Sequence, residues 1–522
     1  MRWIINRRHS ILLIGQRWYI FFPAVLICIC GLIPLGYLIA KAFQLESSTL
    51  VENLLRWRNV RLFFNTIFLT IGVLITDILL ATPAAWLTSR SDIKYPRIFS
   101  VLCTLPLAIP GYVIAYSLLA LGGYNGIFAS LFGWSIPRLN GYWGALIALS
   151  FYTTPYLFLN LRTALLGLDP SVEESARSLG YSQRRVFIHV ILPQLRPAFY
   201  AGGLLICLHV LGDFGVVSLM RYETFSYALY IEYRLLFEHN YAAWLALILL
   251  TITGCLLYLE SRMLNRVDLH KAGHGTSRAP SIIPLHRLKY VGYSYLCVLF
   301  IATVCIPTLT VILWLFRGFE ASTLAGIFEA FLGSVSISIP VAIGCALMAL
   351  PFAYINVRYT TCISNAIARI PYIVYAIPPL AFALSIIFFV KRTDVTVLVL
   401  ISACMLHFLA EAIGPVRSPL YQASPHLEEV ARSLGCSPIM AFLRTLLPLL
   451  FRGMLIAVAL VFLATMKELP LTLLLRPPEY ETLAVNVWDF TEEAMFAQAA
   501  PFAFVILIFS GIFVGLLIRK EE

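Results

Sequence analysis

The sequence is poor in charge: Asp, Glu, Lys and Arg make up only 12% of its 522 residues. A soluble domain carries roughly 25% charged residues, so the composition argues against one. Hydrophobic residues reach 60%. Apolar runs of roughly 20 residues, the length that crosses a bilayer, recur along the chain. The composition therefore predicts an integral membrane protein.

The sequence also lacks the signatures of several enzyme classes. It contains no Gly-x-x-x-x-Gly-Lys-Ser/Thr phosphate loop, so it is not expected to hydrolyse ATP. It has no nucleophile elbow and no His/Asp/Glu cluster with metal-ligand spacing. Its eleven cysteines are scattered, with Cys28 and Cys30 as the one close pair, and form no disulfide framework. We therefore expect no catalysis and no cofactor in this chain, and no metal site is firmly assigned.

The apolar runs predict an all-α protein with about twelve transmembrane helices in two groups of six. The runs of the first group lie near 19–42, 63–88, 98–121, 143–165, 197–220 and 240–261. Those of the second group lie near 289–316, 330–355, 366–390, 394–416, 451–475 and 499–518. The first run is too long for a signal-peptide core and has no small-residue cleavage site, so we expect it to be retained.

Basic residues predict the orientation of the chain. The N-terminal segment and the loops at 90–97, 177–196 and 262–289 are rich in arginine and lysine. Short basic loops stay in the cytoplasm, so both termini are predicted to be cytoplasmic. The net charge of +11 follows from the same rule. We therefore expect membrane lipid around the chain and no nucleic-acid partner.

The most informative feature is a polar stretch that occurs twice. Residues 169–193 (DPSVEESARSLGYSQRRVFIHVILP) correspond to residues 424–448 (SPHLEEVARSLGCSPIMAFLRTLLP), 255 positions apart. We refer to them as the first and second repeated loops. Each loop alone could be a simple connection between spans. Two matching copies in an otherwise apolar chain indicate a docking element that is used twice.

Weaker similarity extends the duplication along the chain. The run LPLAIPG at 105–111 aligns within YIVYAIPP at 372–379, at an offset of 268 positions. The predicted repeats are 1–262, with a core at about 60–262, and 289–522, with a core at about 328–518. A basic cytoplasmic linker at 263–288, rich in helix breakers, joins them. Two repeats of the same orientation imply a pseudo-twofold axis along the membrane normal, with a path between the halves.

Each repeated loop has the pattern of a short helix, a tight turn and a second helix. In the first copy, Asp169 is an N-cap residue and Pro170 takes the first helical position. Gly180 stands where a left-handed residue would end this helix. Ser182 would cap the second helix, which we expect to stop near Pro193. The corresponding residues of the second copy are Ser424, Pro425, Gly435, Ser437 and Pro448.

The first helix of each loop is acidic at its start. Glu173 and Arg177 are spaced i,i+4, as are Glu428 and Arg432, and each spacing predicts an ion pair worth roughly 0.2–0.5 kcal/mol. A helix of about ten residues is marginal in water. Contacts beyond the loop must therefore hold it.

At these residues both loops resemble the "EAA" loop of permease subunits in binding-protein-dependent ATP-binding-cassette (ABC) importers. The resemblance implies two fused copies of a six-helix type I permease. It also implies partners: a homodimeric ATPase that binds ATP outside this chain, one coupling helix docking on each ATPase subunit, and a substrate-binding protein. One departure from the pattern is Ser175 and Val430, where the family usually has alanine. The implied ATPase contacts are Glu173, Glu174, Ala176, Gly180, Glu428, Glu429, Ala431 and Gly435.

Two acidic residues fall at corresponding places in the fifth span of each half. Asp213 and Glu468 are 255 positions apart. An ionisable group inside a span is costly and is by default a functional candidate. Both acids and the neighbouring Lys467 are therefore candidates for the translocation path. Alternatively, Glu468 pairs with Lys467, or both segments lie nearer an aqueous surface.

The segments LGDFGVVSL at 211–219 and MKELPLTLLLRPPEYETLA at 466–484 resemble the fused ferric-iron permeases in particular. This resemblance implies a permease in the bacterial cytoplasmic (inner) membrane that carries ferric iron. Thiamine permeases have a similar layout, and polyamine and phosphonate permeases share the loop, so these substrates remain open. An ion-coupled secondary transporter is the alternative from another class, but it has no need for two coupling helices.

Overall fold

The structure, a computed structural model, describes residues 18–43, 56–234, 239–264, 282–318, 323–359, 361–390, 396–424 and 426–521. Most of the predicted linker at 263–288, and Pro425 of the second repeated loop, lie outside these residues. Within them, nine helices are long and apolar enough to cross a membrane, or up to twelve if each of three bent helix pairs counts as one span. The predicted all-α protein with about twelve spans is confirmed.

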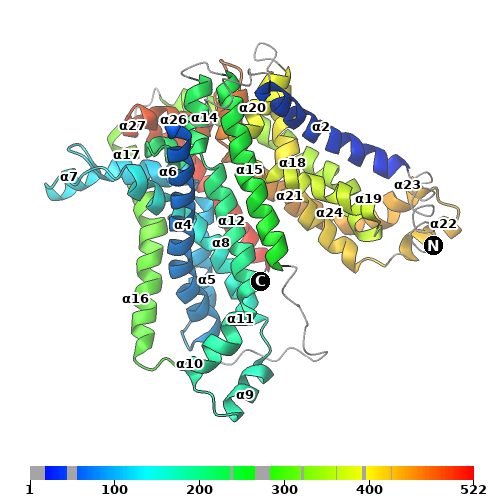
Figure 1. The fold of residues 1–522 in the computed structure, drawn as a ribbon, viewed down its shortest axis with the longest axis horizontal. Helices are drawn as coiled ribbons and strands as arrows, with labels where there is room; N and C mark the ends of the chain where they lie inside the picture. Colours follow the sequence, from blue (N-terminus) through cyan, green and yellow to red (C-terminus); the bar gives the residue numbers. More distant parts are fainter. Residues whose placement is uncertain are drawn as a thin grey trace. The chain divides into compact units, whose positions relative to one another are not determined.

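One compact unit is built mainly from residues 323–486 (Figure 1). Its long helices α18 (Thr323–Arg358), α21 (Val397–Gln422) and α24 (Leu447–Met466) pack on one another. The unit also contains α2 (Trp18–Ala42), which packs on α20 (Pro379–Val390). Its other complete helices are α19 (Cys362–Tyr375), α22 (His426–Ser433), α23 (Pro438–Ala441) and α25 (Pro470–Leu475). It also includes α15 (His239–Leu264) up to Leu247 and α26 (Leu483–Glu492) up to Asn486.

The second compact unit is built mainly from residues 56–234, and α4 (Trp57–Arg90), α8 (Gly141–Leu166) and α12 (Arg196–Gly212) form its centre. It also contains α16 (Leu288–Phe300), α17 (Ile306–Gly318) and α27 (Phe496–Glu521). Its shorter helices are α5 (Pro96–Thr104), α6 (Gly111–Leu121), α7 (Ile127–Phe132), α9 (Pro170–Ser178), α10 (Gln183–Val186), α11 (Leu192–Gln194), α13 (Gly215–Leu219) and α14 (Phe225–Arg234).

The first helix of each predicted repeat packs in the unit that contains the core of the other repeat. In the first unit, the ring of Phe21 on α2 lies 5.2 Å from that of Tyr359, which follows α18. In the second unit, the Tyr295 hydroxyl on α16 donates to the Leu80 carbonyl of α4 at 2.6 Å. The compact units therefore exchange their first helices and do not coincide with the two stretches of repeated sequence.

Two of the three bent pairs break at corresponding prolines. The helical segment Pro96–Ala108 meets α6 at 89°, with Pro110 between them, and α19 meets α20 at 101°, with Pro378 between them. Proline lacks an amide hydrogen and disfavours helical backbone at the residue before it. The two proline-containing runs that align at the 268-position offset are thus the same structural break.

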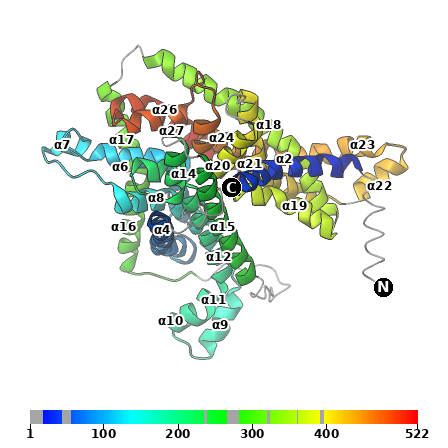
Figure 2. The same ribbon diagram turned by 45° about the horizontal axis from the view of Figure 1, so that its top comes forward.

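The two repeated loops lie at an end of their own unit (Figures 1 and 2), and they differ in how they rejoin the membrane helices. In the first loop, the segment Gln183–Gln194 bends by 59° into α12, so the helix end predicted near Pro193 is confirmed. In the second loop, Pro438–Met466 is one continuous helix, and the end predicted near Pro448 is wrong.

A second proline accounts for this difference. Pro197 lies just inside the start of α12, at the bend, whereas Arg452 occupies the corresponding position of the second loop. A π turn comes just before the corresponding proline in both loops, Phe187–Ile191 before Pro193 and Phe442–Leu446 before Pro448, so it does not distinguish the copies. Such a turn adds one residue to the helix and allows it to accept the proline ring.

Candidate functional site

The first helix of each repeated loop has the predicted shape. Asp169 caps α9, its carboxylate accepting a hydrogen bond from the Ser171 amide at 2.9 Å. The left-handed backbone of Gly180 (φ +84°) ends the helix, and that of Gly435 (φ +87°) follows α22 in the same way. The backbone amide of the residue after each glycine donates to a carbonyl of the preceding helix, Tyr181 to Ala176 and Cys436 to Ala431. This is the usual pattern of a glycine-terminated helix.

The second helices begin at the predicted serines, with one difference between the copies. The Ser437 hydroxyl accepts from the Met440 amide at 3.3 Å. Ser182 has the extended backbone of an N-cap residue (ψ 155°), but its side chain makes no capping bond. The capping prediction is therefore confirmed in full for the second copy and for the backbone alone in the first.

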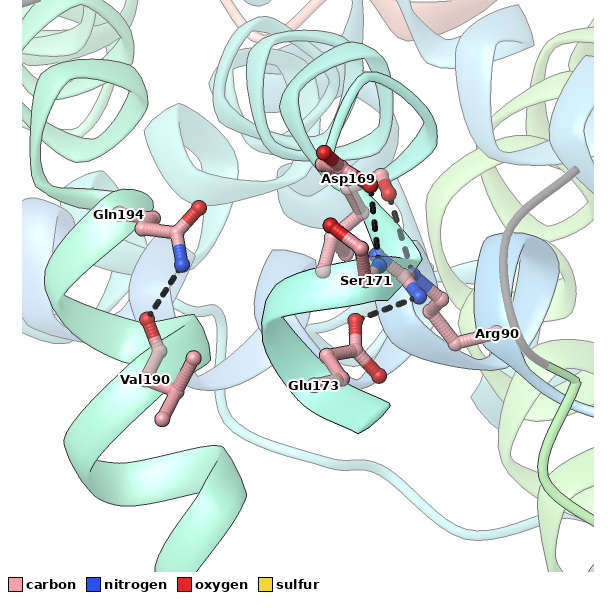
Figure 3. A network of polar contacts seen from close by, with 7 residues as sticks. Arg90, Asp169, Ser171, Glu173, Val190 and Gln194 are labelled. Atoms are coloured by element: carbon pink, nitrogen blue, oxygen red, sulfur yellow. Dashed lines mark hydrogen bonds and ion pairs between the residues drawn. The ribbon is translucent and has the colours of Figure 1, made fainter. Parts of the chain in front are cut away.

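A buried ion pair attaches α9 to the end of α4. An Arg90 guanidinium nitrogen lies 2.8 Å from a Glu173 carboxylate oxygen, and the two side chains are only 2% and 3% exposed. Arg90 also donates from Nε to the Leu165 carbonyl at the end of α8, at 3.1 Å. In Figure 3 the Asp169 and Glu173 side chains both point toward Arg90. Glu173 thus pairs with Arg90, a partner that its i,i+4 spacing from Arg177 did not indicate.

In the second loop a neutral side chain, that of Tyr354, attaches α22 to a membrane helix. The Tyr354 hydroxyl of α18 donates to Glu428 Oε2 at 2.8 Å. One turn further on, Arg358 donates from Nη2 to the Ala423 carbonyl at 3.0 Å. Arg358 is 268 positions after Arg90, the same offset that relates the proline breaks. Both arginines therefore hold the backbone ahead of a repeated loop, but only Arg90 forms an ion pair with its glutamate in the described residues.

The outward faces of α9 and α22 are alike. Leu179 and Leu434 are each 79% exposed. Val172 and Leu427 are exposed near the helix starts, and Glu174 and Glu429 are exposed beside them. Ala176 and Ala431 are buried instead, facing the body of their own unit. The first helices of the two loops thus share exposed apolar side chains at two matching positions and an exposed carboxylate at a third, and α22 adds an exposed Val430 where α9 has Ser175.

The glycines after these helices lie at the surface. Gly180 and Gly435 are exposed, and nothing stands within 4 Å of where a Cβ would be. Their positive φ, and not lack of space, is what favours glycine there. The exposed surface of each loop therefore ends at a fixed turn.

The two acids in the fifth spans lie at helix breaks. Asp213 follows α12 and accepts from the Val216 amide at 2.8 Å, at the start of α13. Glu468 lies between α24 and α25 and accepts from the Leu471 amide at 3.0 Å. Each acid therefore caps the short helix that follows it. The correspondence that the 255-position offset predicted is matched by equivalent local structure.

Two further acids inside spans escaped the sequence interpretation. Asp77, fully buried in the middle of α4, accepts hydrogen bonds from Thr153 at 2.6 Å and Thr154 at 3.0 Å. Glu411 of α21 accepts from the Tyr375 hydroxyl at 2.9 Å and interacts electrostatically with Lys467. Each is a lone acid in an apolar run (ITDILL and FLAEAI), which is the signal that could have revealed it.

These side chains do not form a metal site. Among the residues that the structure describes, no group of three or more His, Cys, Asp or Glu side chains is placed to hold a metal ion. The four acids inside the spans accept hydrogen bonds from hydroxyl groups or from backbone amides at the broken helix ends. Their chemistry is that of a polar lining within a bundle.

A duplicated bundle of up to twelve spanning helices, with broken helices and a polar helix-turn-helix at the end of each half, defines a membrane permease. Its family follows from comparison with known sequences. The chain belongs to the family of binding-protein-dependent transport system inner membrane components, whose pattern it matches twice, over residues 75–259 and 348–520. It is therefore a multi-pass inner-membrane permease of the ABC importer class and not itself an enzyme.

Individual relatives match either the whole chain or half of it. The chain is 33% identical over 509 residues to the Fe(3+)-transport system permease protein FbpB 2 of Haemophilus influenzae, covering 95% of this chain and 98% of that protein. It is 26% identical over 254 residues to the sulfate transport system permease protein CysT of Escherichia coli, covering 48% of this chain and 92% of that protein. A match to the molybdenum transport system permease protein ModB of E. coli (32% over 133 residues) covers 25% of this chain and 58% of that protein.

These lengths confirm the duplication. Almost all of the sulfate permease corresponds to about half of this chain, and the family pattern occurs once in each half. The chain is therefore two permease copies fused in one polypeptide, as the repeated loops predicted.

Proposed function

We propose that this chain is the permease subunit of an ATP-driven importer of ferric iron. The observation that carries this proposal is the similarity to a ferric-iron permease along nearly the whole length of both proteins. The sulfate and molybdenum permeases match at most about half of the chain. Acidic side chains inside both halves also suit a cationic substrate better than an oxyanion. Thiamine, also a cation, is the next candidate.

A separate ATPase would drive the transport through the two repeated loops. Leu179 and Leu434 are large apolar side chains exposed at the same place in both copies, as expected of surfaces that a partner covers. Each would enter a groove of one subunit of an ATPase homodimer, with Glu174 and Glu429 at its edge. The ATPase would not contact Glu173, Glu428 and the two buried alanines directly. These residues would fix α9 and α22 on the membrane helices.

We call the Arg90–Glu173 ion pair and the Tyr354–Glu428 hydrogen bond the two anchors, because they attach α9 and α22 to membrane helices. Through them, closure of the ATPase would reach the membrane helices. When ATP closes the ATPase dimer, α9 would move with its subunit and pull on α4 through Arg90. In the same way α22 would pull on α18 through Tyr354. A binding protein loaded with ferric iron would release its cargo to the outward-open permease. Asp213, Glu468 and Lys467 are the proposed polar groups along the path.

The test is uptake of radioactive ferric iron by iron-starved cells with and without the gene, in the presence of the cognate binding protein. We expect uptake to be lost without the gene and restored by the wild-type chain, but not by the double variant Leu179→Asp/Leu434→Asp at equal protein level. Unchanged iron uptake in the deletion strain would reject ferric iron, and thiamine uptake would be measured next. Uptake that persists in ATP-depleted cells with an intact proton gradient would reject the ATP-driven mechanism.

A further inference from the structure

A cavity of about 600 Å³ lies beside the first repeated loop. Thr82 and Trp86 of α4 line it, together with Phe187 of the π turn that follows α10. Arg177 of α9 and Arg184 of α10 complete the lining. None of these side chains has a role in the attachment of α9 to α4 described above.

The lining is mostly apolar but carries positive charge. None of the lining residues in the described part of the chain is acidic. Both arginines are exposed, and neither forms an ion pair with a described residue. The Thr82 hydroxyl oxygen is buried and has no hydrogen-bond partner among those residues. A buried hydroxyl without a partner is costly, which points to a polar ligand group near it.

The cavity lies where a membrane helix reaches the polar interface. Trp86 precedes Arg90, the last residue of the spanning helix α4, by about one turn. Tryptophan favours this depth because its ring is apolar and its N–H is polar. If the loop lies at the cytoplasmic surface, as in the proposed function, the cavity faces the headgroups of the inner leaflet.

We propose that this cavity binds one anionic phospholipid. The phosphate lies between Arg177 and Arg184, whose guanidinium groups donate charge-assisted hydrogen bonds. An acyl chain lies against Trp86 and Phe187, an apolar wall that inorganic phosphate would leave uncovered. A lipid therefore satisfies both parts of the lining, whereas a free anion satisfies only one.

The second repeated loop differs from the first at two of the lining positions proposed to contact the lipid. Ile439 stands where the first loop has Arg184. Tyr354, the counterpart of Trp86, donates to Glu428, and its ring lies 6.0 Å from that of Phe442. Arg432 and Phe442 still correspond to Arg177 and Phe187, but one arginine is lost and Tyr354, which already donates to Glu428, replaces the tryptophan. One lipid is expected for each chain.

Native mass spectrometry of the purified full-length permease, titrated with phosphatidylglycerol or phosphatidylcholine, tests the proposal. We expect one phosphatidylglycerol to be retained and phosphatidylcholine to be lost. Arg184→Gln should weaken phosphatidylglycerol binding about fivefold, the effect of one basic residue at a membrane surface. Arg184→Lys should retain most of the binding. Arg185→Gln is the matched control, because Arg185 is the next residue but does not line the cavity.

Equal retention of the two lipids, or equal effects of Arg184→Gln and Arg185→Gln, would overturn the proposal. Displacement of the lipid by millimolar inorganic phosphate would assign the cavity to a free anion instead. If Arg184→Gln does not fold, Trp86→Tyr, which imitates the second copy, must weaken binding for the proposal to stand. The readout needs no ATP, ATPase or iron, so a failed transport assay and a failed lipid assay are distinguishable.

Discussion

The two repeated loops present the same face outward and are held by different chemistry inward. Outside, Leu179 and Leu434 are equally exposed. Inside, α9 depends on a buried ion pair between Arg90 and Glu173, whereas α22 depends on a hydrogen bond from neutral Tyr354. A surface that meets a partner is constrained in both copies by that partner. An internal anchor needs only to fix its helix in place, and either an ion pair or a hydrogen bond from a neutral group can do so.

The energetics of the two anchors differ accordingly. A buried pair adds little net stability, because desolvation offsets the attraction, but removal of one partner costs about 3–5 kcal/mol. Loss of one hydrogen bond to a charged group costs about 1.5–3 kcal/mol, and less where water can reach the acceptor. The first loop should therefore be the more sensitive of the two to single substitutions.

The largest expected effect comes from Arg90→Met, which leaves the Glu173 carboxylate buried without its ion-pair partner. We expect a loss of about 3–5 kcal/mol, seen as a lower thermal midpoint of the purified permease and as lost uptake. Adding Glu173→Leu to the same chain should recover more than half of the loss, because no buried charge remains. Arg358→Met is the matched control and should cost less than half as much. Equal losses at the two positions would remove the distinction between the anchors.

Next in size is the loss of the outward contact. Leu179→Asp and Leu434→Asp should each weaken ATPase binding by about 1.5–3 kcal/mol, the value of one buried leucine side chain. Binding of the purified ATPase to immobilised permease measures this. The two losses should be equal, since the exposed faces match. Leu131→Asp, at another exposed leucine, should leave binding unchanged; a similar loss there would show that the effect is not specific to the loops.

Tyr354→Phe should have a smaller effect, about 1–2 kcal/mol, because it removes one hydrogen bond from a carboxylate that is only partly buried. The thermal midpoint of the purified permease reports the change. Tyr95→Phe, at a 71% exposed tyrosine, is the control and should have no effect. A loss of stability as large as that of Arg90→Met would mean that the permease is as sensitive to loss of the second anchor as to loss of the first.

The smallest effect is expected at the turns. Gly180→Ala and Gly435→Ala should each cost about 1 kcal/mol, because alanine disfavours the positive φ at both sites. Asparagine should cost less at either position, since it tolerates this conformation better. The same thermal measurement applies, and the double variant should show the sum of the two losses. A difference between the glycines would show that the turns, like the anchors, have diverged.

The spans and the loop helices were predictable because they depend on local patterns. Each predicted span overlaps an observed helix or bent pair, and Gly180 and Gly435 end the first helices of the loops with the left-handed backbone that their positions indicated. The offset of 255 positions led correctly to Asp213 and Glu468 as equivalent residues. Their shared role as caps of broken helices was not predicted, since an apolar run continues past each of them.

The anchors were not predictable, because they join residues far apart in the sequence. Arg90 ends α4, and four α-helices, α5 to α8, separate it from Glu173 in the sequence. Nothing in the loop indicates that Glu173 pairs with Arg90 and not with Arg177. Tyr354 is an aromatic residue in an apolar run and gives no polar signal. The continuous helix through Pro448 was also missed, although the sequence carries a signal for it: Arg452 stands where the first loop has its second proline, Pro197.

The exchange of first helices has a consequence for biosynthesis. Helix α2 leaves the ribosome early, yet its packing partner α20 follows more than 300 residues later. At about 5–20 residues per second, translation separates the two by roughly 20–70 s. During that time α2 waits in the bilayer without its native neighbours. A chain stopped before α18 can complete neither unit, so the fusion of two permeases makes folding of this protein an event of late translation.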